Sequence, residues 1–302
     1  MESVFIQKIF LLTEEILANK RDLAEIYKEL ETHLTRARRL KFGLYEAETL
    51  NTVAIYHFFN NQIEIALDTF QMAWAIAQKL DNIDIKIKLA GNLGETYMRL
   101  WRLDEALQML VPIVELIRKE KLETLMAFQA VENLVWVDTI RGEYTTADEL
   151  IDEAWKMASQ IEMRGYSRTE YAQMIIVLHQ QKILIDIAKS KFEAAKERLS
   201  LLRGLLNTYN RQDFEDDYTS ILAIYKLFSE INSASLDTFE KSLESGEVVL
   251  DASRMLNMAM FMEKNHKPDW AKRMARRALD KVKDEKKPPP KLIEIANHIV
   301  NA

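Results

Sequence analysis

Three asparagines, Asn51, Asn92 and Asn133, follow one another at intervals of 41 residues. A carboxamide side chain carries both a hydrogen-bond donor and an acceptor, so it complements a peptide unit. A row of carboxamides at equivalent positions can hold an extended backbone without reading its side chains. The same amides can instead tie neighbouring helices together, and the sequence leaves both roles open.

Residue patterns typical of catalysis do not occur in the sequence. None of the five histidines lies three or four positions from another, and there is no H-E-x-x-H, G-x-S-x-G or phosphate-binding glycine loop. The absence of cysteine excludes disulfides, thiolate catalysis and cysteine-based metal centres. Asp216 and Asp217 lie in RQDFEDDY, which reads as a solvated helix start rather than a catalytic carboxylate pair. We therefore expect no catalytic residue, no metal and no cofactor.

The composition indicates a helical chain with an ordinary core. Of the 302 residues, 48% are hydrophobic and 29% are charged, and only 7 Gly and 5 Pro occur, which is too few turn formers for an all-β protein. No run of 18 apolar residues is present, so we expect no membrane span. The first twenty residues lack the basic start and cleavage site of a signal peptide, which favours a cytoplasmic location.

A small residue recurs near the predicted start of every second helix. These marker residues are Ala24, Ala66, Ala106, Ala147, Ala195, Ala234 and Ala271. The steps between them are 42, 40, 41, 48, 39 and 37 residues, and a near-constant period in this range is typical of a helical repeat protein. A small side chain lets the two helices of a hairpin cross closely, and Gly91 and Gly94 are expected to do the same.

The unit around residues 92–110 carries a family resemblance. Leu93, Gly94, Tyr97 and Ala106 stand at the offsets of tetratricopeptide repeats, which the chain resembles over residues 2–285. This unit lacks the family's Trp and terminal Pro, and the period of about 40 exceeds the usual 34. Long repeats of this kind resemble those of bacterial transcriptional and peptide-sensing regulators.

The resemblance implies an all-α fold, a right-handed α-solenoid of about seven helix-turn-helix repeats over residues 1–287. A final helix in residues 288–302 is expected to cap the same domain, because a terminal repeat otherwise exposes its apolar face. Its apolar side chains are Leu292, Ile293, Ile295, Ala296 and Ile299.

The resemblance also implies that the position fourteen before each marker faces the inner surface. That position holds Thr52, Asn92, Asn133, Gln181, Ser220 and Asn257, and Asn51 precedes the first of them. Together with charged and aromatic residues on the same helices, these amides give the expected peptide-binding residues: Asn51, Asn92, Asn133, Gln181, Asn257, Glu95, Arg99, Trp136, Phe58 and Phe59. No row of lysines follows the groove, so a partner held by its terminal carboxylate is not expected.

The C-terminal region is the one charge anomaly. Residues 264–291 hold eleven Lys or Arg and four Asp or Glu, whereas the whole chain carries a net charge of −6. Such a basic stretch marks either an acidic partner or the solvated face of an amphipathic helix. Trp270 is its lone aromatic residue and no helix-turn-helix motif precedes the repeats, so a nucleic-acid partner is not favoured.

The sequence thus predicts a non-catalytic scaffold that binds a peptide or a protein segment in a concave groove. The alternative is a regulatory sensor module of a bacterial signalling or transcription system that acts with a separate effector. The sequence names neither the ligand nor an oligomeric state.

Overall fold

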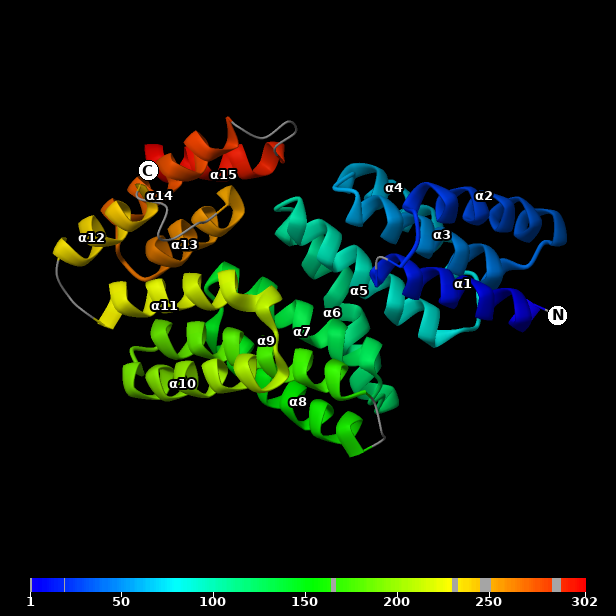
Figure 1. Cartoon of the computed structure of the whole chain (residues 1–302), viewed down its shortest axis with the longest axis horizontal. Coiled ribbons are helices and arrows are strands. Elements are labelled where there is room, and N and C mark those ends of the chain that lie inside the picture. Colours follow the sequence, from blue (N-terminus) through cyan, green and yellow to red (C-terminus); the bar gives the residue numbers. More distant parts are fainter. Residues whose placement is uncertain (1, 19, 164–166, 230–232, 245–250, 284–288) are drawn as a thin grey trace. The chain divides into compact units, whose positions relative to one another are not determined.

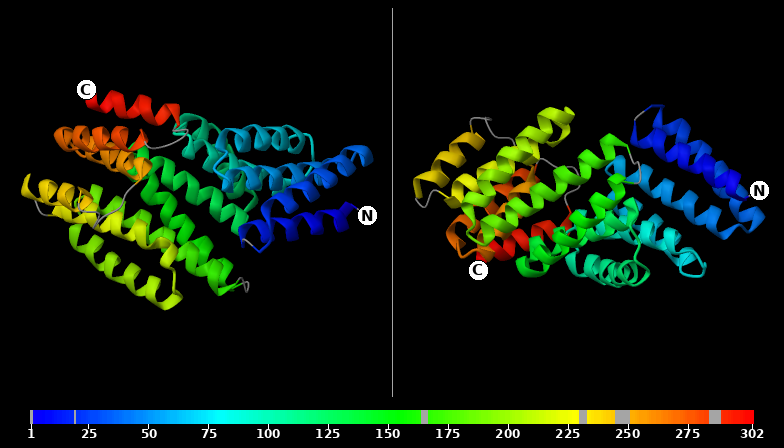
Figure 2. Two further views of the ribbon diagram at one scale, coloured as in Figure 1. Left: turned by 45° about the horizontal axis from the view of Figure 1, so that its top comes forward. Right: turned by 90° about the horizontal axis from the view of Figure 1, so that it is seen from below.

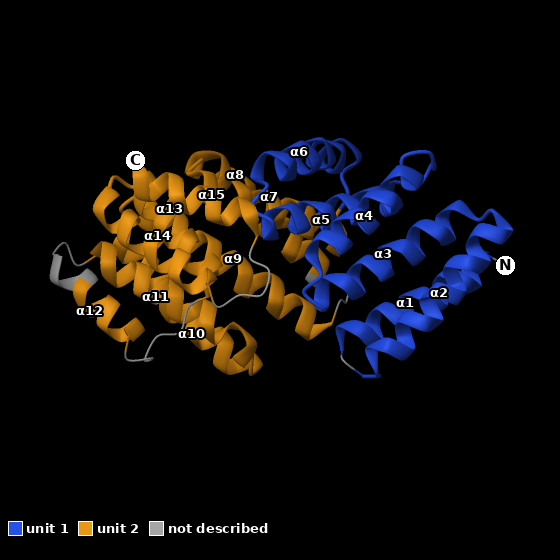
Figure 3. Cartoon of the chain, turned by 90° about the horizontal axis from the view of Figure 1, so that it is seen from above, with its two compact units in different colours: residues 1–122 blue, residues 123–302 orange. Residues whose placement is uncertain are grey.

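The computed structural model describes residues 2–18, 20–163, 167–229, 233–244, 251–283 and 289–302. These residues form fifteen α-helices and one short 3-10 helix, without a strand (Figure 1). Two compact units divide the chain, residues 1–122 and residues 123–302 (Figure 3).

The first unit holds three helical hairpins, each made of an odd-numbered and an even-numbered helix. Their bounds are α1 (Glu2–Leu17), α2 (Leu23–Leu40), α3 (Gly43–Phe59), α4 (Ile63–Ala77), α5 (Ile83–Arg99) and α6 (Leu103–Glu120). The odd-numbered helices lie beside one another, because α3 contacts both α1 and α5.

The second unit holds four further hairpins and a final helix. The helices are α7 (Leu125–Arg141), α8 (Tyr144–Met163), α9 (Arg168–Ala188), α10 (Phe192–Tyr209), α11 (Glu215–Ser229), α12 (Ser233–Glu244), α13 (Ala252–Lys264), α14 (Pro268–Val282) and α15 (Pro290–Asn301). The 3-10 turn Gln212–Phe214 precedes α11.

The same turn joins the two helices of five hairpins. One residue at each turn has a left-handed backbone: Asn61, Trp101, Gly142, Ser190 and His266. The following N–H donates across the turn, as from Arg102 to the Tyr97 carbonyl at 2.9 Å and from Lys191 to the Asp186 carbonyl at 2.8 Å. This is the Schellman pattern, which satisfies carbonyls at a helix end. Each left-handed residue stands five positions before a marker alanine. The turn between the two helices therefore recurs with the same spacing as the marker.

The marker alanines occupy one position in the hairpins. Ala66, Ala106, Ala147, Ala195 and Ala271 each lie three residues after the first residue of an even-numbered helix and are fully buried. The marker of the first repeat is wrong: Ala24 is exposed, and the fully buried Ile26 occupies the equivalent position of α2. The side chain of Ala234 lies outside the described residues.

Gly94 lies where α5 crosses α6, as predicted. A Cβ atom at this position would come within 2.6 Å of Leu110 Cδ2, and Leu110 is itself fully buried. The expectation for Gly91 is wrong, because a Cβ there would meet nothing within 4 Å. One glycine of the pair therefore fixes the separation of the two helices, and the other does not.

Four odd-numbered helices begin at side-chain caps, and one of the four begins a turn early. Asn82, Thr124, Ser167 and Asp251 accept hydrogen bonds from the first turns of α5, α7, α9 and α13. Helix α9 has 21 residues, whereas α3, α5 and α7 have 17 each. Its extra N-terminal turn, together with the 20-residue helix α8, accounts for the long step of 48 residues between Ala147 and Ala195.

Helix α13 returns to the first hairpin of the second unit. It contacts α7, and Asn265 Nδ2 donates to the Tyr144 hydroxyl at 2.9 Å across 121 residues. The Tyr144 and Phe261 rings pack edge to face at 6.0 Å, and burial raises the pKa of Tyr144 to about 12. The first and the last hairpin of this unit are therefore in direct contact.

Helix α15 packs on the last hairpin. It lies alongside α14 and also contacts α13 (Figures 1 and 2). Of its predicted apolar contacts, Leu292, Ala296 and Ile299 are buried, and Ile293 and Ile295 are half-buried. The helix therefore covers apolar surface of α13 and α14, as expected of an end cap.

Candidate ligand-binding surface

The two asparagines of the first unit bind each other. Asn92 Nδ2 on α5 donates to Asn51 Oδ1 on α3 at 2.7 Å, and Asn51 is only 3% exposed. At the next residue of α3, the hydroxyls of Thr13 on α1 and Thr52 lie 2.7 Å apart. These contacts tie neighbouring odd-numbered helices together. This is the second of the two roles that the sequence left open for the asparagine row.

A buried ion pair reinforces the same contact. Lys88 Nζ on α5 lies 2.7 and 2.8 Å from the two carboxylate oxygens of Glu48 on α3, and the Glu48 residue is 5% exposed. Burial raises the pKa of Glu48, although Lys88 acts in the opposite direction. Sequence reasoning missed this pair, but its separation of 40 residues equals the repeat period and could have revealed it.

Four predicted residues of the first unit fall into one neighbourhood at the C-terminal ends of α3 and α5. The Arg99 guanidinium lies 5.5 Å from the centre of the Phe58 ring, and the Phe58 and Phe59 rings meet edge to face at 6.0 Å. Phe59 is 57% exposed. Burial raises the pKa of Glu95, one turn before Arg99, and Arg99 acts against that rise. An aromatic and charged surface therefore exists here, separate from the asparagine pair.

The predicted amides of the second unit are differently placed. Gln181 on α9 is fully buried, and its Nε2 donates to Glu132 Oε1 on α7 at 2.6 Å. Its Oε1 atom is buried without a hydrogen-bond partner in the part of the chain that the structure describes, and so is Oδ1 of Asn257 on α13. Both amides hold the position fourteen before a marker alanine. Two acceptors therefore remain unsatisfied at equivalent places, unlike the pair in the first unit.

The other predicted residues of the second unit lie on α7. Asn133 is 8% exposed, and Trp136, one turn later, is half-buried. Helix α7 contacts both α9 and α13, so it adjoins the two helices that carry the unsatisfied acceptors.

A buried imidazole on α9 escaped the sequence prediction. His179 packs edge to face against Trp155 at 5.0 Å, and its Nδ1 atom is buried without a hydrogen-bond partner. Burial lowers its pKa to about 4, with a smaller contribution from Arg198. The side chain is therefore neutral near pH 7, and nothing in its sequence neighbourhood signals this.

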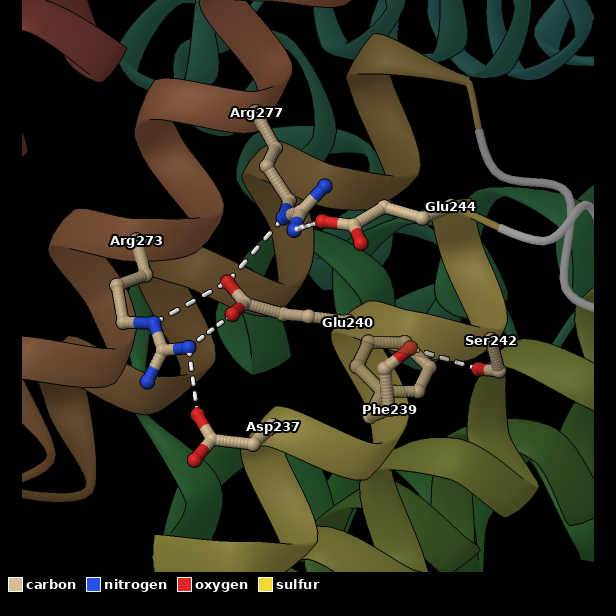
Figure 4. Close-up of polar contacts among 7 residues, drawn as sticks. All are labelled: Asp237, Phe239, Glu240, Ser242, Glu244, Arg273 and Arg277. Atoms are coloured by element: carbon tan, nitrogen blue, oxygen red, sulfur yellow. Dashed lines mark hydrogen bonds and ion pairs between the residues drawn. The ribbon is translucent and has the colours of Figure 1, made fainter.

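The basic C-terminal stretch is partly neutralised within the second unit. Arg273 and Arg277 of α14 point toward three carboxylates of α12 (Figure 4). Arg277 Nη2 lies 2.7 Å from Glu244, Arg273 Nη2 lies 2.8 Å from Asp237, and both guanidiniums bind Glu240, which is 9% exposed. Two of the eleven basic residues of this stretch are therefore paired with carboxylates of the protein itself.

Neither a metal-binding cluster nor a membrane-spanning helix occurs among the described residues. No group of three or more potential metal-binding side chains occurs in that part of the chain. None of the described helices is both long and apolar enough to cross a membrane.

Comparisons with known proteins bear on the fold. No protein-family profile matches the chain, and no curated protein matches it. A solved Rap protein complexed with Competence and Sporulation Factor is similar over 99% of this chain and 98% of that chain, with 12% identity and a TM-score of 0.55. The chain has the all-helical repeat fold of that Rap protein. This confirms the predicted all-α repeat fold, and at such low identity the likeness extends to the fold alone.

A second solved structure is a tetratricopeptide repeat protein from Parabacteroides merdae. It is similar over 98% of each chain, with 12% identity and a TM-score of 0.49.

Proposed function

We propose that this protein is a non-catalytic binding protein that holds a peptide or a protein segment against the odd-numbered helices of its second unit. The observation that carries the proposal is the acceptor Oδ1 of the half-buried Asn257, which has no hydrogen-bond partner among the described residues. A buried polar atom without a partner costs about 1–3 kcal/mol. Backbone N–H groups of a bound segment are donors that relieve this cost.

The proposal narrows the surface predicted from the sequence. Asn51 and Asn92 bind each other, so we assign them a structural role. Asn257 and Trp136, both half-buried, remain as ligand-binding residues, with the indole of Trp136 available as an apolar anchor, whereas Gln181 is fully buried and bonds α9 to α7. The Rap protein of similar fold, which was solved with Competence and Sporulation Factor, supports a role in binding a separate molecule.

The test uses Asn257→Leu, which keeps the size of the side chain and removes its acceptor. Peptides are captured from native cell extract with the wild-type chain, identified, and titrated by calorimetry. We expect Asn257→Leu to weaken binding by roughly 5-fold or more, since one hydrogen bond is worth about 0.5–1.5 kcal/mol and a ligand donor is also left unpaired. The free protein should melt at a higher temperature, because a buried unsatisfied atom has been removed.

The matched control is Asn92→Leu. It breaks the hydrogen bond with Asn51, so it should lower the melting temperature and leave the affinity unchanged. Equal affinity of the wild type and Asn257→Leu would overturn the assignment of the ligand to the second unit.

A second candidate function is a regulatory sensor that acts with a separate effector. The supporting observation is the attachment of α12, whose Asp237, Glu240 and Glu244 bind Arg273 and Arg277 of α14 through charges. Such pairs weaken with salt and respond to a nearby charge. Hydrogen exchange in residues 237–244 should change when the captured peptide binds, and unchanged exchange there would count against a sensor that works through α12.

A further inference from the structure

A pocket of about 220 Å³ opens in the second unit, away from the unsatisfied amides. Its lining residues are Arg168, Thr169, Ala172, Thr208, Tyr209 and Arg211. One water takes about 30 Å³ of liquid volume, so the pocket has room for a small molecule rather than a single water. No carboxylate is among the lining residues.

The pocket exists because α9 begins one turn early. Arg168 and Thr169 belong to the extra turn, which brings them beside Thr208 and Tyr209 at the C-terminal end of α10. The shorter odd-numbered helices α5 and α7 lack residues at this place. Length added to one repeat commonly builds a binding feature on one face of the protein.

Two guanidinium groups line the pocket, and the carboxylate of Asp213 pairs with one of them. The Arg168 guanidinium lies 5.3 Å from the centre of the Tyr209 ring, and its side chain has no ion pair within the described residues. Arg211 is held by Asp213 through Nε at 2.9 Å and Nη2 at 2.7 Å, and it lies 4.6 Å from the Phe214 ring. The Arg211 side chain is 14% exposed, so its position is fixed by these contacts.

The remaining polar groups of the pocket also favour an anion. The first N–H groups of α9 have no carbonyl partner within the helix, and the positive end of the helix dipole lies at this point. Ser167 and Glu170 form a capping box, in which the Glu170 carboxylate accepts from Ser167 at 2.9 Å from N and 2.6 Å from Oγ and Ser167 Oγ accepts from the Glu170 N–H, so the N–H groups of Arg168 and Thr169 are the donors left at this end of α9. The Thr169 and Tyr209 hydroxyls add two donors, whereas the Thr208 hydroxyl donates to the Gly204 carbonyl at 2.8 Å.

We propose that this pocket, lined by Arg168, Thr169, Tyr209 and Arg211, binds a small phosphate monoester. A phosphate dianion offers three terminal oxygens to several donors. The Arg168 guanidinium is a fork that can bind phosphate in a bidentate manner, and Arg211, whose Nε and Nη2 are taken by Asp213, offers its buried Nη1, which has no partner among the described residues. A carboxylate offers one charge and two oxygens, which leaves donors of the pocket unsatisfied. The site does not depend on the proposed peptide surface.

The test is calorimetric titration of the full chain with phenyl phosphate, with benzoate as the carboxylate analogue, at constant ionic strength set with sodium chloride. Phenyl phosphate should bind, and benzoate should bind roughly tenfold more weakly or worse, because charge-assisted hydrogen bonds are lost. Inorganic phosphate should compete with phenyl phosphate. Absence of phenyl phosphate binding, or equal binding of benzoate, would overturn the proposal.

Three variants locate the site. Arg168→Ala removes an exposed side chain without an ion pair, and it should weaken phenyl phosphate binding about tenfold or more while the melting temperature stays within error. Thr169→Val should also weaken phenyl phosphate binding, but by less than Arg168→Ala does. Arg276→Ala removes an equal charge from the exposed face of α14 and should leave binding unchanged. If Arg276→Ala weakened binding as much as Arg168→Ala, the attraction would be general to the basic surface and the pocket would not be the site.

Discussion

At the scale of single residues, the separation of α5 and α6 depends on the missing side chain of Gly94. Gly94→Ala places a methyl group against the buried Leu110, with Cβ 2.6 Å from Leu110 Cδ2 unless the helices move. Overpacking of this kind costs about 1–3 kcal/mol, whereas alanine gains about 0.5–1 kcal/mol in helix propensity, so we expect the free energy of unfolding to fall by about 2 kcal/mol or less in urea titrations.

Gly91 provides the matched control, three residues earlier on the same helix. Its Cβ would meet nothing within 4 Å, so Gly91→Ala should raise the free energy of unfolding by about 0.5–1 kcal/mol through helix propensity. A loss of stability in both variants would show that helix crossing is not the cause.

Asp138 makes the stability of the second unit depend on pH. Burial, with a smaller contribution from Glu143, raises its pKa from 3.8 to about 6. The folded state therefore binds the proton more tightly than the unfolded state, and this contribution to stability is lost as pH rises from about 4 to about 6. Asp138→Asn keeps the side chain neutral, so it should be more stable than the wild type above pH 6, by up to about 3 kcal/mol.

The measurement is urea unfolding of both proteins between pH 4 and pH 8. His179 has the opposite dependence, because a pKa lowered to about 4 makes stability fall as pH falls below about 6.5. The difference between the two proteins removes that contribution, which both share. A constant difference across the pH range would contradict the shifted pKa of Asp138.

At the scale of the helical hairpin, the repeated element is a turn whose left-handed residue is rarely glycine. Only Gly142 is a glycine among the five, and the left-handed region is unfavourable for other residues by about 1–2 kcal/mol. Ser190 is exposed, so Ser190→Gly should relieve this strain without changing a packing contact, and it should raise the free energy of unfolding by about 0.5–1 kcal/mol.

The control for this substitution is Ser200→Gly in the interior of α10. Ser200 is also exposed, but its backbone is helical, so glycine should destabilise the protein there. Equal effects of the two glycines on the urea midpoint would rule out relief of strain at the turn.

Helix α15 can be tested at its most buried contact. Leu292 is fully buried against the last hairpin, and Leu292→Asp places a charge where no partner is available. We expect α15 to detach, with a lower melting temperature and aggregation of the exposed face of α13 and α14. Asn297→Asp, on the exposed side of the same helix, should behave as the wild type in light scattering. If both variants aggregated, the cause would be the change in net charge and not the detachment of α15 from α13 and α14.

The sequence predicted the elements better than the contacts between them. Five markers fell on one buried position because a close helix crossing requires a small residue, whereas Ala24 was misplaced because Ile26 fills that position in the first repeat. The left-handed positions of these turns could not be predicted, because serine, asparagine, histidine and tryptophan do not favour a left-handed backbone as strongly as glycine does. The pairing of Asn92 with Asn51 could not be read from spacing, since the same period places an amide either beside its neighbour or beside a ligand.

At the scale of the whole molecule, each repeat contacts mainly its sequence neighbours within a unit. Proteins built in this way respond locally to substitution. Gly94→Ala should therefore speed hydrogen exchange in α5 and α6 and leave the exchange of α13 and α14 unchanged. Faster exchange throughout the chain would instead indicate a single cooperative unit.

The return of α13 to α7 has a consequence for how the second unit unfolds. A linear series of hairpins frays from its ends, but here the contact between Tyr144 and Asn265 closes a loop of 121 residues. The entropic cost of closing a loop grows only logarithmically with its length, so this long-range contact can form once the intervening hairpins have formed. Neither the α7–α8 hairpin nor the α13–α14 hairpin can then peel away without breaking the contact. The second unit should lose its structure in one concerted transition, with the closing contact among the last to form on refolding.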